Sequence, residues 1–303
     1  SEAIVFALTL VGDPGDEVIV PEPFYTNYAG FAVQAGLVVV PVTCRLTEGF
    51  RLPAAMEIES RITNRTRALL VCSPCNPTGH VLTATEWDEL RDLAIRHDLF
   101  LLSDEVYREF VYDGAKPTSV LAIRGLGDRA VMLDSISKRY SVCGARVGCL
   151  VTRNREVLDG ALRLGQARLC PPTMEQMAAM KAIHASPSYL EGVVDEYRRR
   201  RDAIFEELES IPGTRALKPE GAFYAMVRLP VDDADHFCRW LLSDFSMEGE
   251  TVMLAPGGGF YATPGLGRDE VRIAYVLNVP TLRKSMGLLR RALEVYPRRE
   301  TTA

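Results

Sequence analysis

Residues 99–107 read LFLLSDEVY, an unbroken apolar run that stops at a cluster of polar side chains. The segment Leu99–Ser103 shows no polar alternation, so it predicts a short strand buried on both faces. Similar runs recur at Glu17–Val20, Leu37–Thr43, Arg67–Cys72, Ala130–Asp134 and Arg146–Thr152. Helical patterns lie between several of these runs, at Tyr25–Ala35 and Thr83–His97. The alternation predicts an α/β fold, with a mostly parallel sheet flanked by helices.

The pattern changes after Pro171-Pro172. The segment Ser188–Ile211 carries apolar side chains at helical spacing and predicts one long helix. Beyond it we expect a strand pair and two helices, at Gly221–Leu229, Glu270–Leu277, Ala234–Leu242 and Thr281–Tyr296. We therefore predict a large domain over residues 1–190 and a smaller α+β domain over residues 191–303.

The composition limits the kinds of ligand. Of the 303 residues, 47% are hydrophobic and 25% charged, as in ordinary globular domains. Lys and Arg total 35 against 40 Asp and Glu, so no basic excess favours a nucleic acid or an anionic membrane. The apolar run Ala3–Val11 is too short to span a bilayer and predicts a helix. Seven scattered Cys predict reduced thiols in a cytoplasmic protein, and we expect a small-molecule ligand.

Polar residues cluster just after the predicted strands, where ligands bind in open α/β sheets. The clusters are Ser73–Gly79, Ser103–Tyr107 and Ser135–Lys138, and Arg146 follows the last of them. A desolvated Lys amine loses its proton and attacks carbonyl groups, so Lys138 is a candidate for a Schiff base. Asp104 is a candidate partner for a protonated pyridine nitrogen, and pyridoxal phosphate needs such a Lys and acid. From spacing alone, Lys138 is equally a solvated lysine and Asp104 a helix N-cap.

The motifs occur in a family's order along nearly the whole chain. They are Asn76-Pro77-Thr78-Gly79, Ser103–Tyr107, Ser135–Lys138 with Arg146-Val147-Gly148, and Arg272-Ile273-Ala274. On these motifs the sequence resembles the pyridoxal-phosphate-dependent aminotransferases of fold type I, class I/II, and most closely the aspartate aminotransferase branch. The resemblance implies the fold-type-I architecture and pyridoxal 5′-phosphate as the cofactor.

The resemblance also implies roles for the residues around the cofactor ring. Lys138, Asp104 and Tyr107 are the expected catalytic residues: Lys138 forms the Schiff base and moves protons, and Asp104 keeps the pyridine nitrogen protonated. Tyr107 and Asn76 are expected to hydrogen-bond the phenolic oxygen, and Tyr25 to stack on the ring. The alternatives are a core role for Tyr107, a turn role for Asn76 and a helix-entry contact for Tyr25.

Further residues are expected to bind the anionic groups. Ser135, Arg146 and the backbone N–H groups near Ser1 and Glu2 would bind the cofactor phosphate, since a helix N-terminus attracts anions. We expect Arg146 to open an apolar strand and to form a buried ion pair; otherwise it is a surface residue. Arg272, with Asn76, would bind the substrate α-carboxylate through its planar fork, the alternative being an exposed strand Arg.

Other motifs carry less weight. Cys72-x-x-Cys75 looks like a redox or zinc motif, but no second pair of ligands stands at metal spacing, so we expect bystander thiols and no metal. His80, His97, His184 and His236 are isolated. Gly257-Gly258-Gly259 lacks the strand–turn–helix context of a dinucleotide site.

The expected activity is transfer of an amino group between an amino acid, with aspartate or glutamate favoured, and a 2-oxo acid such as 2-oxoglutarate, by a ping-pong Schiff-base mechanism. The alternatives are a carbon–sulfur β-lyase or a decarboxylase with the same cofactor, or a catalytically silent fragment. The resemblance further implies a homodimer with shared active sites. Relative to the family, the chain starts at the phosphate-binding turn, so we expect the preceding segment of the small domain to be missing.

Overall fold

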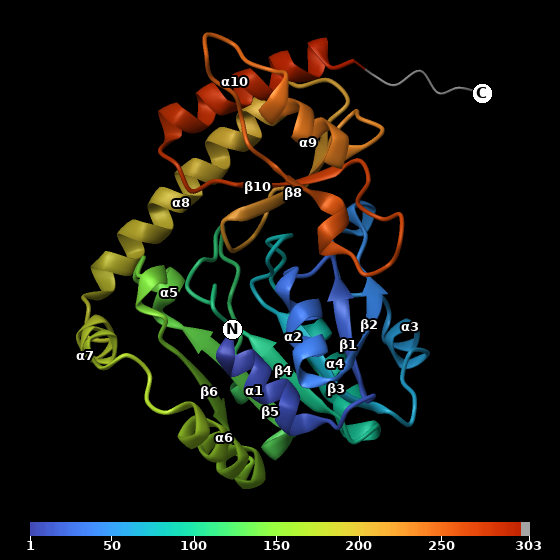
Figure 1. The fold of residues 1–303 in the computed structure, drawn as a ribbon, viewed down its shortest axis with the longest axis vertical. Helices are drawn as coiled ribbons and strands as arrows, with labels where there is room; N and C mark the ends of the chain where they lie inside the picture. The colour runs from blue at the N-terminus through green and yellow to red at the C-terminus, as the bar shows by residue number, and fades with distance from the viewer. Residues whose placement is uncertain (298–303) are drawn as a thin grey trace.

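The computed structural model describes residues 1–297 of the chain (Figure 1). Its larger sheet has the strand order β2-β1-β3-β4-β5-β6. The strands are β1 (Glu17–Glu22), β2 (Val38–Thr43), β3 (Thr66–Cys72), β4 (Phe100–Asp104), β5 (Ala130–Ser135) and β6 (Gly148–Thr152). The pairs from β2 to β5 are parallel, and β6 runs antiparallel to β5. The predicted architecture is confirmed, with one edge strand reversed.

Helices cover both faces of this sheet because side chains along each strand alternate between the faces. The helices α1 (Glu2–Val11) and α2 (Asn27–Ala35) pack on one face, against Val18, Leu70 and Leu102. On the other face, α4 (Ala84–Arg96) packs Trp87, Leu90 and Leu93 against Ile19, Leu69 and Leu101. The short helix α3 (Ala55–Glu59) contributes Ile58 to this second face. The central strands β1, β3, β4 and β5 are therefore largely buried. The expectation of burial on both faces is wrong for the edge strands β2 and β6, which expose side chains such as Val38 and Val151.

The second sheet is antiparallel in all its pairs, with the order β7-β8-β10-β9. Its strands are β7 (Arg215–Ala216), β8 (Tyr224–Arg228), β9 (Ala255–Pro256) and β10 (Glu270–Ala274), with helices α9 (Ala234–Ser243) and α10 (Val279–Val295). The long helix α8 (Pro187–Leu208) runs from beside α5 up to α10 in Figure 1. We propose residue 190, inside α8, as the boundary between the two domains.

Four helices lie outside the predicted elements: α3, α5 (Ile136–Arg139), α6 (Arg155–Arg168) and α7 (Thr173–Ala182). The α7 helix buries none of its residues. Short 3-10 turns occupy Leu46–Glu48, Val120–Ala122, Gly127–Arg129, Cys143–Ala145 and Gly257–Phe260. In residues 1–297, no helix combines the length and apolar character needed to cross a membrane.

Candidate active site

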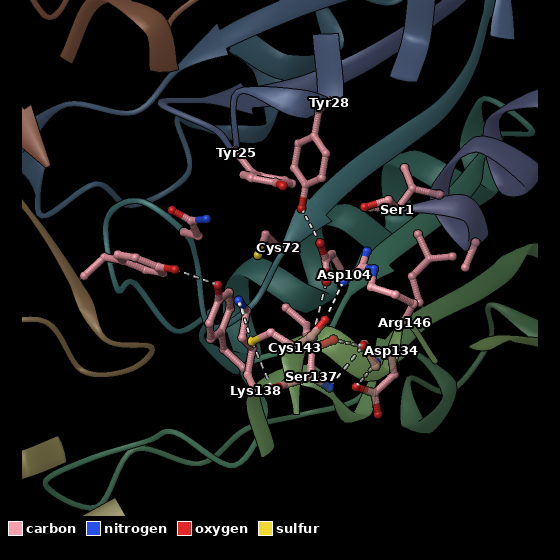
Figure 2. Close-up of a pocket in the computed structure, with 18 of the residues that line it drawn as sticks. Ser1, Tyr25, Tyr28, Cys72, Asp104, Asp134, Ser137, Lys138, Cys143 and Arg146 are labelled. Atoms are coloured by element: carbon pink, nitrogen blue, oxygen red, sulfur yellow. Dashed lines mark hydrogen bonds between the residues drawn. The ribbon is translucent and has the colours of Figure 1, made fainter. Parts of the chain in front are cut away.

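A cavity of about 300 Å³ opens beyond the carboxyl ends of β3, β4 and β5, beside the start of α1 (Figure 2). The parallel register places Cys72 opposite Asp104 and Asp104 opposite Leu133, so the ends of these strands meet at one edge. The second sheet covers the cavity from the other side with Tyr224 of β8 and Arg272 of β10. Residues that were expected at the site and line the cavity are Ser1, Tyr25, Asn76, Asp104, Tyr107, Ser135, Lys138, Arg146 and Arg272.

Asp104 is the last residue of β4 and is 7% exposed. Burial raises the pKa of its carboxyl group, and two hydrogen bonds to the carboxylate oppose that rise. The hydroxyl of Tyr28 donates to Oδ2 at 2.7 Å, and the backbone N–H of Val106 donates to Oδ1 at 3.2 Å. Within residues 1–297 no Lys or Arg side chain forms an ion pair with Asp104. The site therefore holds a buried acid with no ion-pair partner among the described Lys and Arg side chains.

Lys138 stands in the first turns of α5, directly after β5. Ser135 caps this short helix by accepting a hydrogen bond from the backbone N–H of Ser137 at 3.1 Å. The cap directs the partly buried Lys138 toward the cavity, where its Nζ lies 3.6 Å from the Sγ of Cys143. No carboxylate in the described part of the chain pairs with this amine. Lys138 is thus a cavity-lining amine without a counter-ion.

Donors for an anion gather at the cavity wall nearest α1. The first N–H groups of a helix have no intrahelical acceptor, so the start of α1 at Ser1 offers free donors. Ser135 Oγ lies 2.7 Å from Ser137 Oγ and 2.9 Å from the Val147 carbonyl oxygen. Glu2 was expected beside the phosphate-binding N–H groups, but it does not line the cavity. Its carboxylate pairs with Arg168 of α6 at 2.6 Å.

The expected environment of Arg146 is wrong. The strand begins two residues later, at Gly148, and Arg146 is exposed in the left-handed region at φ 54°. Its Nη1 donates to the Cys143 carbonyl oxygen at 2.8 Å instead of pairing with a carboxylate. A left-handed conformation is costly for a residue with a side chain, and here it turns the guanidinium back toward the cavity. The apolar residues after Arg146 predicted a strand that begins at Arg146, but the left-handed turn at this residue delays the start of β6 to Gly148.

The carboxylate-binding candidates come together across the two sheets. Arg272 Nη1 donates to Oδ1 of Asn76, which is 4% exposed, at 3.0 Å. The Nε of Arg272 is buried without a partner in residues 1–297. Tyr107 is also buried, and its hydroxyl lies 3.1 Å from the hydroxyl of Tyr224. A planar cation with an unsatisfied donor therefore faces a cavity that already contains an amine and an acid.

Tyr25 lines the cavity beside Tyr28, whose ring it meets edge-on at 5.5 Å between centroids. Its hydroxyl accepts a hydrogen bond from Asn27 Nδ2 at 2.8 Å. Stacking of Tyr25 on a cofactor ring stays a prediction.

Sequence reasoning missed several residues that line the cavity, namely Tyr28, Cys72, Asp134, Ser137, Cys143 and Tyr224. Tyr28 carried a signal, because it follows Tyr25 by three residues, a spacing that puts both side chains on one side of the predicted helix Tyr25–Ala35. Cys143 and Ser137 also flank Lys138 closely in the sequence. Tyr224 carried no local signal, since its contacts with Tyr107 and Arg272 join residues more than forty positions apart.

Known proteins match this chain over a segment that includes the whole cavity. A family model described as aminotransferase class I and II matches residues 1–284. The aromatic-amino-acid aminotransferase 2 of Thermococcus litoralis is 33% identical over 297 residues, covering 97% of this chain and 74% of that protein. An aspartate aminotransferase of Pyrococcus abyssi is 31% identical over 296 residues, with the same coverages. Among solved structures, Thermus thermophilus aspartate aminotransferase with maleate has a TM-score of 0.86 at 31% identity, covering 96% of this chain and 73% of that one. Every residue that lines the cavity lies within the matched segment.

Proposed function

The chain belongs to the class I and II aminotransferases, enzymes that use pyridoxal 5′-phosphate, and from this premise we propose that it transfers the amino group of aspartate or glutamate to a 2-oxo acid such as 2-oxoglutarate. The observation that carries the proposal is the joint placement of Lys138, Asp104 and Arg272 around one cavity.

The residues of the cavity suit this cofactor. Asp104 is a buried carboxylate without a cation among the described residues, and a protonated pyridine nitrogen would supply that cation. Ser135, Arg146 and the start of α1 would hold the phosphate. Asn76 and Tyr107 would donate hydrogen bonds to the phenolic oxygen. Tyr25 would stack on the ring. When bound, the cofactor supplies an aldehyde that condenses with amines and a ring that withdraws electrons.

The protein's own groups then have separate tasks. Lys138 Nζ would hold the cofactor and, as a free amine, would carry a proton to and from the substrate Cα. The Asp104 carboxylate holds the proton on the ring nitrogen. The burial of Tyr107 holds the pKa of its phenol well above the ordinary value, so its hydroxyl stays protonated as a donor. The second sheet covers this chemistry and limits the access of water.

Substrate recognition is proposed to begin at Arg272. Its planar fork suits the α-carboxylate, which every amino acid carries, and Nε lacks a partner until such a ligand binds. The other cations that line the cavity in residues 1–297 are Lys138 and Arg146. Both have tasks at the cofactor, so the side-chain carboxylate of aspartate requires a cation from another source. A neighbouring subunit is the source that we propose.

A homodimer is accordingly proposed. The segment from α6 to α7 exposes large apolar side chains, at Leu162, Leu169, Met174, Met177, Met180 and Ile183. Exposed large apolar side chains gathered in one segment of the chain are typical of an interaction face. The free state of all seven cysteines supports our proposal of a reducing, cytoplasmic location.

Two experiments test the activity and the lysine. Aspartate, glutamate, phenylalanine or arginine is added singly to the cofactor-loaded protein, and the cofactor absorbance and the released 2-oxo acid are followed. We expect stoichiometric conversion, fastest with the dicarboxylic substrates, and turnover only with an added 2-oxo acid. Release of pyruvate and ammonia without an acceptor would instead indicate a lyase.

Borohydride reduction should attach the cofactor to a peptide that contains Lys138, and Lys138→Ala should abolish the labelling. The matched control is Lys116→Ala, which changes an exposed lysine outside the cavity and should label normally. Labelling of another lysine in the native protein would remove Lys138 from the site.

A further inference from the structure

Tyr224 joins the two halves of the cavity although the proposed chemistry assigns it no task. It begins β8, which pairs with β10 so that Tyr224 stands opposite Ala274 and Met226 opposite Arg272. Side chains two residues apart on a strand share a face, so Tyr224 and Arg272 are diagonal neighbours on one face of the sheet. Tyr224 is 9% exposed and lines the cavity.

The ring of Tyr224 supports the Arg272 guanidinium. The guanidinium carbon lies 4.5 Å from the centroid of the Tyr224 ring and 4.9 Å from that of Phe260. Arg272 forms no ion pair with a carboxylate of residues 1–297, and its side-chain hydrogen bond goes to the neutral Asn76. Aromatic faces therefore orient the cation without neutralising it, which leaves the charge for a carboxylate ligand.

The hydroxyl of Tyr224 contacts a second cavity residue, Tyr107. It lies 3.1 Å from the hydroxyl of Tyr107, and the two rings meet edge-on at 5.7 Å. Each phenol has a single proton to donate. If Tyr224 donates to the Tyr107 oxygen, the proton of Tyr107 is free to point into the cavity, and it becomes a stronger donor because hydrogen bonds in series polarise one another.

We propose that Tyr224 is a positioning residue with two contacts: its ring orients Arg272 toward the substrate α-carboxylate, and its hydroxyl directs the Tyr107 proton toward the cofactor's phenolic oxygen. The inference rests on the proposed function. Each contact is removed by a different substitution, so the two parts are tested separately.

Tyr224→Phe keeps the ring and removes the hydroxyl. Without this hydroxyl, Tyr107 would donate a weaker hydrogen bond, and more negative charge would stay on the cofactor's phenolic oxygen. That charge would make the nearby nitrogen of Lys138, which holds the cofactor, more basic. The visible absorbance of the resting holoenzyme changes with pH, and the midpoint of that change should rise by about 0.3 to 1 pH unit. A shift of this size corresponds to part of the free energy of one hydrogen bond. The Kd of an unreactive carboxylate such as maleate, measured by absorbance titration, should change less than twofold.

Tyr224→Leu removes both contacts, so it should raise the pH midpoint in the same way and also weaken carboxylate binding by about 3- to 10-fold. The matched control is Phe260→Leu, which removes the second aromatic contact of Arg272 and leaves the Tyr107 hydroxyl untouched. It should weaken carboxylate binding without moving the midpoint. Circular dichroism and thermal unfolding verify that each variant folds.

Two results would overturn the inference: an unchanged midpoint in Tyr224→Phe, or unchanged carboxylate affinity in a folded Tyr224→Leu protein. Failure of the proposed function is a separate result, because the unmodified protein would then show no cofactor absorbance or no conversion by amino acids.

Discussion

Burial makes the Asp104 carboxylate costly to ionise, and a bound cation would offset that cost. Burial raises the pKa of its carboxyl group, and a pyridinium nearby favours the charged form. Asp104→Asn keeps the size and removes the charge, so the amide cannot keep the ring nitrogen protonated. Turnover should fall by about 10²- to 10³-fold, while cofactor affinity falls less. Steady-state kinetics and cofactor titration measure the two effects, and near-native turnover would contradict the proposed role.

Tyr28 sets how readily Asp104 ionises. Its hydroxyl donates to Oδ2 at 2.7 Å, and such a bond favours the carboxylate. Tyr28→Phe removes the donor, so the pKa of Asp104, already raised, should rise further, by about 1 unit or more for a bond to a charged group. Cofactor binding that depends on the carboxylate is present above that pKa and is lost as pH falls through it. The acidic midpoint of cofactor affinity should therefore move to higher pH, and an identical midpoint in both proteins would exclude this contact as the cause.

Placement at the cavity was predictable where neighbours in the sequence carried the signal. Asp104 ends a strand, Lys138 and Asn76 follow one within a few residues, and the strand ends bring all three to one cavity. Arg146 was placed correctly at the cavity but wrongly in its surroundings, because a left-handed turn precedes β6. Tyr224 could not be found, since its partners come from distant strands and loops.

At the level of elements, the loop that carries Asn76 is fixed by contact with the second sheet. Gly79 adopts φ +73°, and a Cβ there would stand 2.2 Å from Pro219 Cβ and 2.7 Å from the Gly221 carbonyl oxygen. The backbone oxygen of Gly79 also accepts a hydrogen bond from the Gly221 N–H at 2.8 Å. The loop can therefore approach the second sheet only if this position lacks a side chain.

Gly79→Ala should lower the free energy of unfolding by about 2 to 4 kcal/mol, from left-handed strain together with overpacking. It should also weaken substrate binding, because the Asn76 loop must shift away from Arg272. The matched control is Gly114→Ala, which has a similar φ of +83° but no atom within 4 Å of the added Cβ, so about 1 kcal/mol is expected. Denaturant unfolding compares the variants, and equal losses would show that the close approach contributes nothing.

Strands were the more predictable elements. Each expected strand of the first sheet lies within two residues of the observed one, as with Arg146 expected and Gly148 observed at the start of β6. Strands buried on both faces leave a plain signal in the sequence. The α6 and α7 helices were missed because their apolar residues do not form one buried stripe: α6 buries only Val157, and α7 buries none.

On the scale of the molecule, the cavity depends on both sheets. The first sheet supplies Asp104 and Lys138 and the second supplies Tyr224 and Arg272, so a relative shift of the two would open the site. The helix α8 runs along one side of the molecule from beside α5 to α10, and its Arg201 is fully buried. Arg201 pairs with Asp113 at 2.9 Å and donates to the Pro219 carbonyl oxygen at 2.9 Å. These contacts tie the long helix to the loop that follows β4 and to the loop between β7 and β8.

The exposed apolar side chains of α7 give the last prediction. Met174 and Met177 are 81% and 64% exposed, and their burial in a symmetric interface would stabilise a dimer by the hydrophobic effect. Replacing both by Glu should weaken dimerisation by about 10²-fold or more, since each buried Met contributes about 1.5 kcal/mol or more. Because the proposed homodimer shares its active sites between subunits, cofactor affinity should fall together with the dimer.

The matched control is Met56→Glu, which places the same charge at a 78% exposed methionine of α3, remote from α7 in the chain. Sedimentation measures the association and absorbance measures the bound cofactor. The control should remain dimeric and fully loaded, because a surface charge outside the interface changes neither contact. If the unmodified protein sediments as a monomer that binds cofactor fully, α7 is not a subunit interface, and the cation for the distal carboxylate must come from elsewhere than a second subunit.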